Sequence, residues 1–388
     1  MDKLSWNDED RHIHFRLDEA VAKKRGLSLA ARYALNPKKY KGDSNVTFPF
    51  TIANVDLFVF STSICILAFE LRFQDDDPYK IAAAQYYLRK ISTEQIHRVD
   101  DSYHYQPESF VEISERILKD AASSLSLDFF FYATPNNEKA NFLTYIDVPE
   151  QASYDRELFF LKWCYHDKFD YNNADYDDSE DYRASECTVW GLSPSAAACL
   201  VTRKKTQIDF IENIFQRNFR KQYLLTYILL HQKYMMYFFL TKMTIGLEGN
   251  LVQLEKYKSQ LFDFETHYMS SYISEVPQYQ RFYTKVRKAF LLNELFSDVQ
   301  EPLLQLTEIK KEQSEKKRRE YDDRINTALT TLSLLTIVSA LTDASGITAN
   351  MDWFLPGKIA RVIQMITLIG VAIISMIMLC RLLFLKKH

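Results

Sequence analysis

The sequence predicts a mixed α/β (or α+β) cytosolic domain, then a bundle of long helices and a C-terminal two-helix transmembrane hairpin. Strand-like runs alternate with helix-like runs before residue 200, which is typical of an α/β domain. Helical spacing then dominates, and two uncharged apolar runs lie near the C-terminus. The expected boundaries are a polar N-terminal extension at 1–45, the α/β domain at 46–200, the helical stalk at 201–320 and the hairpin with its basic tail at 321–388.

The first strands and helices of the α/β domain follow from local signals. Residues 46–73 are rich in β-branched and aromatic side chains and predict two or three strands. Asp77 is a suitable N-cap, and Pro78 at the first helical position predicts that a helix begins there. A second helix is expected at 109–124. Further strands are expected at 127–134, 141–146 and 157–165.

The end of this domain contains candidate ligand-binding groups. The acidic segment 166–183 has the oxygen ligands that divalent cations prefer, but it lacks the glycine of an EF-hand, so we favour a solvated loop. The Ser193-Pro194-Ser195 stretch predicts a helix start and does not match a nucleophile elbow. A basic triplet that either binds an anionic ligand or forms a solvated surface consists of Arg203, Lys204 and Lys205.

Composition and motifs argue against several functions. The net charge of -3 argues against a generally basic nucleic-acid-binding protein, and no glycine-rich phosphate loop is present. The 5 cysteines are scattered, which indicates reduced thiols without a zinc site. No catalytic constellation occurs, so we expect no enzyme activity. His231, within an apolar helix, is interpreted as a hydrogen-bonded core residue and not as a metal ligand.

The two apolar runs, 325–342 and 362–380, are each close to the roughly 20 residues that cross a bilayer as a helix. The alternative is a pair of buried core helices. Basic residues flank both outer ends, so the positive-inside rule predicts a multi-pass protein of the cell inner membrane with both termini cytoplasmic. No glycine or proline follows Pro302 before the first run, so one helix is expected to connect the stalk to it.

The first apolar run contains a polar stripe with 4,3,4,3 spacing. Such spacing places side chains on one face of a coiled-coil-like bundle, so the stripe would line a pore if several copies assembled around it. The alternative is packing between helices through hydroxyl hydrogen bonds. The stripe consists of Asn326, Thr330, Ser333, Ile337 and Ala340.

This layout resembles the CorA family of divalent-cation transporters, mainly over the last 190 or so residues. The resemblance implies a homopentamer whose first membrane helix lines a pore, with a selectivity loop after it. The family signature is a contiguous Gly-Met-Asn, whereas this chain has Gly346 and then Asn350-Met351 in inverted order, which puts Mg²⁺ selectivity in doubt. The residues assigned to the expected pore-mouth loop are Asp343, Gly346, Asn350, Met351 and Asp352.

The segments "VDLFVFSTSICILAFEL", "VWGLSPSAAACL" and "YILLHQKYMMYFFLTKM" are similar to divergent CorA-like proteins associated with type III CRISPR systems. That resemblance implies a ligand-gated ion channel in anti-phage defence, controlled by a nucleotide messenger made from ATP and S-adenosylmethionine. The alternatives are a divalent-cation transporter with a degenerate selectivity loop and a non-conducting, membrane-anchored signalling scaffold. No cofactor is required by the sequence. The expected partners are the lipid bilayer, other copies of the chain and the nucleotide, but no nucleic acid.

Overall fold

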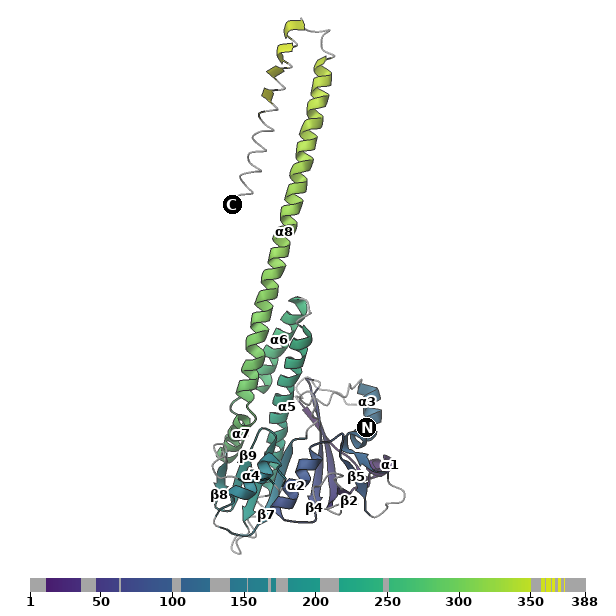
Figure 1. Ribbon diagram of the computed structural model, residues 1–388, viewed down its shortest axis with the longest axis vertical. Coiled ribbons are helices and arrows are strands. Elements are labelled where there is room, and N and C mark those ends of the chain that lie inside the picture. The colour runs from purple at the N-terminus through teal and green to yellow at the C-terminus, as the bar shows by residue number, and fades with distance from the viewer. Residues whose placement is uncertain are drawn as a thin grey trace. The chain divides into compact units, whose positions relative to one another are not determined.

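The computed structural model divides into two compact units, Met1–Leu306 and Thr307–His388, and each is described separately. Figure 1 shows the order of their helices and strands. The residues that the structure describes are 12–35, 47–62, 64–99, 106–125, 140–151, 153–166, 169–171, 181–202, 216–246, 251–349, 357–359, 361–363, 365–366, 369–370 and 373.

The first unit contains a six-stranded antiparallel sheet built around one long strand, β3 (Phe48–Phe60). Strands β1 and β2 pair with the two ends of β3 on one side, and β4 pairs along the other side. The sheet order is β1-β3-β2-β5-β6, with β4 paired to β3. The other strands are β1 (His12–Arg16), β2 (Arg32–Leu35), β4 (Cys65–Phe73), β5 (Gln95–Arg98) and β6 (Glu108–Ser109). The segment 1–45, expected to be a polar extension, therefore contributes two strands.

A second, four-stranded sheet has the order β7-β10-β9-β8. Strand β10 is buried along its whole length, pairs parallel with β7 and antiparallel with β9, and is therefore the centre of this sheet. Strand β7 confirms the strand predicted at 141–146. The strands are β7 (Phe142–Val148), β8 (Tyr182–Ser185), β9 (Thr188–Leu192) and β10 (Ala196–Thr202).

Short helices pack between and against the sheets, and two of them begin where the sequence predicts. The side chain of Asp77 accepts a hydrogen bond from the backbone N of Tyr79 (3.0 Å), and Pro78 is the first residue of its helix. A capping box of Ser109 and Glu112 begins the second predicted helix. The helices are α1 (Glu19–Lys24), α2 (Pro78–Leu88), α3 (Phe110–Leu125) and α4 (Asp155–Trp163).

Two local predictions in this unit are wrong. The expected strand at 157–165 is instead mostly helix α4, which buries one apolar side against β9 and β10. Short apolar runs fit either structure, and tertiary packing selects the helix here. The expected helix start at Ser193 is a turn into β10, in which the backbone N of Ser193 donates to the carbonyl O of Ala196 (2.9 Å).

Long helices make up the rest of the described chain. Helix α5 packs against both sheets and against α6 and α7, so apolar side chains surround most of it. It begins and ends within a segment for which helix was predicted from residue 206 onward. The helices are α5 (Gln216–Gly246), α6 (Leu251–Tyr268), α7 (Pro277–Ala289) and α8 (Leu292–Ala349).

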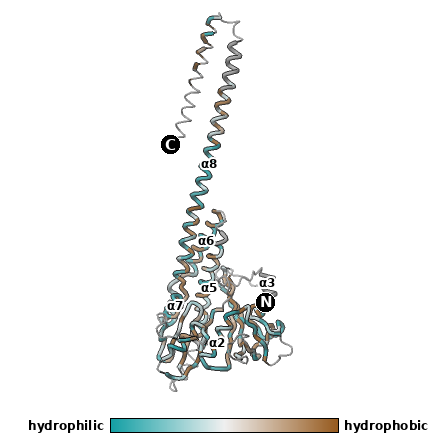
Figure 2. Tube along the Cα trace, in the orientation of Figure 1, coloured by the Kyte–Doolittle hydropathy of each residue, from teal (hydrophilic) through white to brown (hydrophobic). Residues whose placement is uncertain are grey.

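The predicted transmembrane hairpin is contradicted. In the part of the chain that the structure describes, no helix combines the length and the apolar character needed to cross a membrane. The prediction of a multi-pass inner-membrane protein with cytoplasmic termini is therefore also wrong. Helix α8 continues through Ala349, so residues 343–349, expected in a loop, are helical. Figure 2 shows the hydrophilic stretch along the middle of α8, whose charges separate its apolar portions.

Candidate functional site

Three polar side chains lie at alternating positions of the edge strand β1. His12, His14 and Arg16 share one face of the sheet because successive side chains of a strand point to opposite sides. This face is also the one that helix α5 covers. Their partners in register on β3 are Phe60, Phe58 and Asp56, respectively.

Asp56 is a carboxylate with only 2% of its surface exposed. Its Oδ1 accepts from Arg16 Nε (2.9 Å) and contacts His14 Nε2 (3.1 Å), while its Oδ2 accepts from Arg16 Nη2 (3.1 Å) and from the Tyr223 hydroxyl (2.9 Å). Burial tends to raise the pKa of this carboxyl, but hydrogen bonds from Arg16, Tyr223 and His14 outweigh it and lower the pKa below 3.8. Asp56 is therefore ionised at neutral pH, with both oxygens occupied.

Aromatic rings extend this cluster into the interface with α5. The His14 and Phe58 rings stack with centroids 4.3 Å apart, and Tyr227 stacks on Phe58 at 3.8 Å. The Phe60 ring stacks on His231 at 3.9 Å. Ring stacking therefore connects β3 to α5 in two layers, a packing arrangement with defined geometry.

Helix α5 presents Tyr223, Tyr227 and His231 at intervals of four residues, so they lie on one face of the helix. Burial raises the pKa of both tyrosines. Burial, and then the charge of His12, lowers the pKa of His231 to about 3, so this imidazole is neutral. His231 is fully buried and its Nε2 lies 2.6 Å from the Thr62 hydroxyl, which confirms the hydrogen-bonded core residue that the sequence predicts.

The β1–β3–α5 cluster holds structural elements together, and its carboxylate is not arranged for proton transfer. A carboxylate whose oxygens are both occupied by donors is poorly placed to accept a proton from a substrate, whereas it fixes the groups around it. Arg16 and His14 are partly exposed, so the donors of β1 are open to solvent while Asp56 itself is buried. Asp56 thus links the edge strand β1, through Arg16, to helix α5, through Tyr223.

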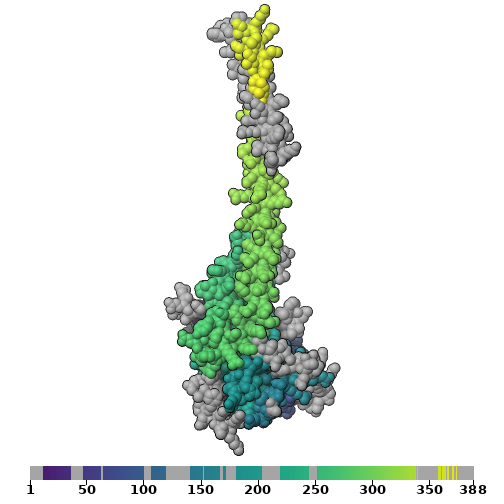
Figure 3. Space-filling model, turned by 90° about the vertical axis from the view of Figure 1, so that its left-hand side faces the viewer, coloured from purple at the N-terminus to yellow at the C-terminus, as the bar shows by residue number. Residues whose placement is uncertain are grey.

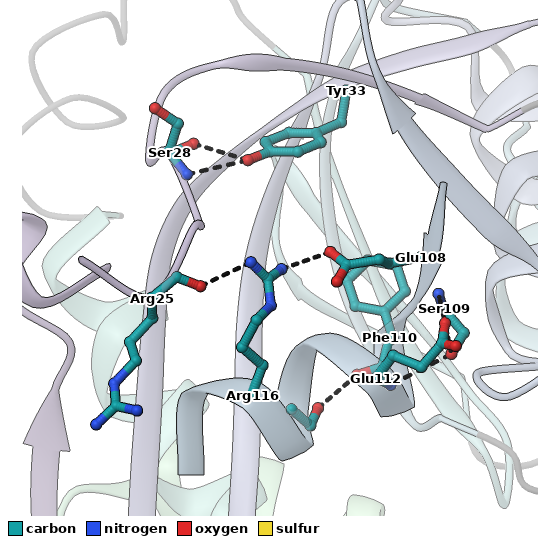
Figure 4. A network of polar contacts seen from close by, with 9 residues as sticks. Arg25, Ser28, Tyr33, Glu108, Ser109, Phe110, Glu112 and Arg116 are labelled. Atoms are coloured by element: carbon teal, nitrogen blue, oxygen red, sulfur yellow. Dashed lines mark hydrogen bonds and ion pairs between the residues drawn. The ribbon is translucent and has the colours of Figure 1, made fainter. Parts of the chain in front are cut away.

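A second polar network lies on the other side of the same sheet (Figure 4). The Arg116 guanidinium donates to the carbonyl O of Arg25 and forms an ion pair with Glu108, which ties α3 to the turn after α1. Gly26 in that turn has a φ of 72°, and a Cβ there would collide with Arg116. The Tyr33 hydroxyl bonds both backbone groups of Ser28. These contacts fix the turn after α1 against α3 and β2.

The predicted polar stripe lies on α8, as its spacing requires. Asn326 and Ser333 are exposed, and Thr330 and Ile337 are half-buried; Ala340 belongs to the same helix. The Thr330 hydroxyl donates to the carbonyl O of Asn326 (2.6 Å), and the Ser333 hydroxyl donates to that of residue 329 (2.8 Å). These hydroxyls are therefore satisfied within their own helix.

The remaining predicted site residues are placed only in part. Asp343 and Gly346 lie in the helical backbone of α8. Three of the pore-mouth residues and the whole basic triplet, together with most of the acidic segment 166–183, fall outside the described residues. Where side chains are described, no group of three or more His, Cys, Asp or Glu residues is arranged to hold a metal ion. The residues outside are Asn350, Met351, Asp352, Arg203, Lys204 and Lys205.

An apolar stripe on a neighbouring face of α8 did not enter the sequence-based site. At about 100° per residue its five members span about 120° of the helix surface, the width of a packing face. The three leucines are exposed by 58% to 64%. Figure 3 shows, in green, side chains of the lower part of α8 on the visible face. The members are Tyr321, Ile325, Leu329, Leu332 and Leu335. Their spacing of four, four, three and three residues was the signal that could have identified them.

Comparisons of the chain with models of known protein families, with curated proteins and with solved structures found no match. The β1–β3–α5 cluster and the apolar stripe of α8 are therefore the basis for any functional proposal.

Proposed function

We propose that the protein is a signal-responsive effector that works as a homo-oligomer assembled through α8. The observation that carries this proposal is the uncovered apolar stripe from Tyr321 to Leu335. Fully burying one leucine side chain contributes roughly 1.5–3 kcal/mol, so five large side chains provide a substantial driving force for association.

A second copy of the chain is the occupant that the stripe fits best. Each copy has the same stripe, so symmetric pairing of α8 helices buries all of them at once. The intervals of three and four residues are those at which side chains interlock between neighbouring helices. The polar stripe of Asn326, Thr330 and Ser333 lies on a different face, which gives each helix one side for contact and one side for a polar environment.

The first unit is proposed to receive the signal. In the β1–β3–α5 cluster, the partly exposed guanidinium of Arg16 holds a buried carboxylate that also binds α5 through Tyr223. The similarity to CRISPR-associated proteins supports a nucleotide messenger of the S-adenosylmethionine–AMP type as the signal, and a role in anti-phage defence. Gated ion flux and divalent-cation transport both depended on the hairpin that the structure contradicts, and neither is part of this proposal. A scaffold that assembles without any ligand is the alternative.

Sedimentation velocity of the full chain tests the assembly. We expect wild-type protein to sediment as an oligomer and the double variant Leu329→Asp/Leu332→Asp to sediment as a monomer, because charges on the apolar stripe oppose its burial. Titration of the nucleotide then separates an effector, whose assembly or conformation changes, from a scaffold, which does not respond.

The matched control is Thr330→Asp/Ser333→Asp, which places the same two charges on the neighbouring polar face. We expect this control to retain the wild-type mass. Wild-type protein that is monomeric at all concentrations, or dissociation of only the control variant, would contradict assembly through the apolar stripe.

A further inference from the structure

Lys233 on α5 is a buried lysine, with 7% of its surface exposed. No carboxylate is its partner among the described residues, although isolated charges are costly to remove from water and normally pair with an opposite charge. Its Nζ instead donates to the carbonyl O of Pro194 and to Asn141 Oδ1 (3.4 Å), and it lies 5.0 Å from the centre of the Phe290 ring. Two neutral oxygens and one aromatic face therefore surround this ammonium.

The Lys233 ammonium contacts two separate parts of the fold: the segments before β7 and β10, and the end of α7. Asn141 and Pro194 precede β7 and β10, whose first residues pair in register. Phe290 ends α7 and is followed by Leu291, which has a φ of 53° and forms the corner into α8. A leucine in this left-handed conformation costs about 1 kcal/mol, so the corner is held in place by its surroundings.

We propose that Lys233 is a charge-dependent trigger that makes the α7–α8 corner ready to open, because opening lets the buried ammonium reach water. While the corner is closed, the charge is held by two neutral oxygens and one aromatic ring, with no carboxylate partner among the described residues. When Phe290 moves away, water replaces them and the charge is better solvated. The trigger does not depend on self-association, so it goes beyond the proposed function.

The electrostatic surroundings agree with this geometry. Burial alone lowers the pKa of Lys233 from 10.5 to about 8, so the group is mostly charged at neutral pH. Of the residues that the structure describes before β7 and β10, those beside the ammonium are Asn141 and the Ser193–Ser195 turn, which carry no titratable side chain. On α5, burial raises the pKa of Tyr234 to about 12, and this phenol accepts from Asn141.

Helix α7 contributes only cationic groups at its end. Arg287 donates to the carbonyls of Met269 and Ser270, and Lys288 lies in the same last turn. The last turn of α7 therefore offers Lys233 no carboxylate. The sign of the pH dependence follows: the closed corner loses the proton near pH 8 and the open, solvated corner near pH 10.5, so protonation favours opening.

Hydrogen–deuterium exchange of the full chain between pH 6.5 and 9.5 tests this trigger, with rates divided by intrinsic exchange rates. We expect Lys233→Met to increase the protection of amides in 288–295 at least tenfold at pH 7. Wild-type protection of the same amides should rise above pH 8, and that of the variant should stay flat. Unchanged or decreased protection in Lys233→Met would overturn the proposal, because the lysine contacts would then be neutral or would hold the corner closed.

Two further variants keep the result interpretable. Lys221→Met removes an exposed lysine of the same helix that lies 5.1 Å from the Tyr279 ring, and it should leave the corner unchanged. If Lys233→Met does not fold, Phe290→Leu serves as the test variant. It retains the Lys233 charge but removes the aromatic face that stabilises that charge. Its corner should be less protected than wild type at pH 7, with the difference narrowing by pH 9.5. A difference that does not change with pH would overturn the trigger.

Discussion

Asp56 shows how a single buried charge is kept in this protein. Four donor contacts reach its two oxygens, two of them from the guanidinium of Arg16 and the others from His14 and Tyr223. Hydrogen bonds to the charged form offset the loss of hydration, which is why the pKa falls although the group is buried. The charge therefore stabilises the fold only while the carboxyl is ionised.

We expect Asp56→Asn to lower the free energy of unfolding by about 2 kcal/mol at pH 7, because it leaves Arg16 without its counter-ion. Arg16 is about half exposed, so solvent screens part of the loss. The stability that the Asp56 charge contributes is fully present above the unfolded-state pKa of 3.8. It is lost as the pH falls through the lower pKa of the folded protein, so the unfolding free energies of wild type and Asp56→Asn should become equal in acid. Urea unfolding from pH 7 down to pH 3 measures this.

The control for this prediction is Glu70→Gln on the same sheet, whose carboxylate is 41% exposed and pairs with Arg72. An exposed pair contributes about 0–1 kcal/mol, so this variant should remain close to wild type. Equal stabilities of Asp56→Asn and Glu70→Gln would show that the cluster does not support the fold.

Individual helices and strands reveal where local signals suffice. The Asp77-Pro78 start of α2 and strand β7 were predicted, because a cap or a β-branched run acts within a few residues. Helix α4 was not predicted as a helix. Its apolar run is too short to show whether apolar residues recur every 3.6 residues, as in a helix, or every 2 residues, as in a strand. The hairpin prediction failed because apolar content near the C-terminus was interpreted as membrane-spanning.

Helix α3 gives a test at this scale. Ser109 Oγ accepts from the backbone N of Glu112 (3.2 Å), and Glu112 in return accepts from the backbone N of Ser109 (2.7 Å). We expect Ser109→Ala to lower the free energy of unfolding by about 1 kcal/mol, because the backbone N of Glu112 loses the hydroxyl that accepts its hydrogen bond. Hydrogen exchange should show the loss in the first turn of α3. Glu115→Ala, an exposed change in the same helix, should have no comparable effect.

Helix α8 has 58 residues, and the boundary between the two compact units falls within it. An isolated helix gains little stability from propensity alone, and most helices in proteins are stabilised by an apolar face packed on a partner. Among the described residues of the single chain, none covers the apolar stripe of α8. Association of copies would therefore stabilise this part of the helix.

We expect the amide protection of residues 321–337 to fall on dilution of wild-type protein, because mass action removes the partner helix. Protection in β10, which is buried within one chain, should not depend on concentration. Hydrogen exchange at two concentrations a hundredfold apart measures both regions in one experiment. Protection of 321–337 that is independent of concentration would indicate that α8 is stable alone.

The sequence by itself determined the features that act over short distances: the helix start at Pro78, the burial of His231, the long uninterrupted helix after Pro302 and the shared face of the polar stripe. Only the tertiary structure decided the environments of Asp56 and Lys233. Tyr223 and Asp56 are 167 residues apart in the chain, and Lys233 is 39 residues from Pro194. Strand register and the packing of α5 bring these groups together, and neither leaves a periodic signal in the sequence.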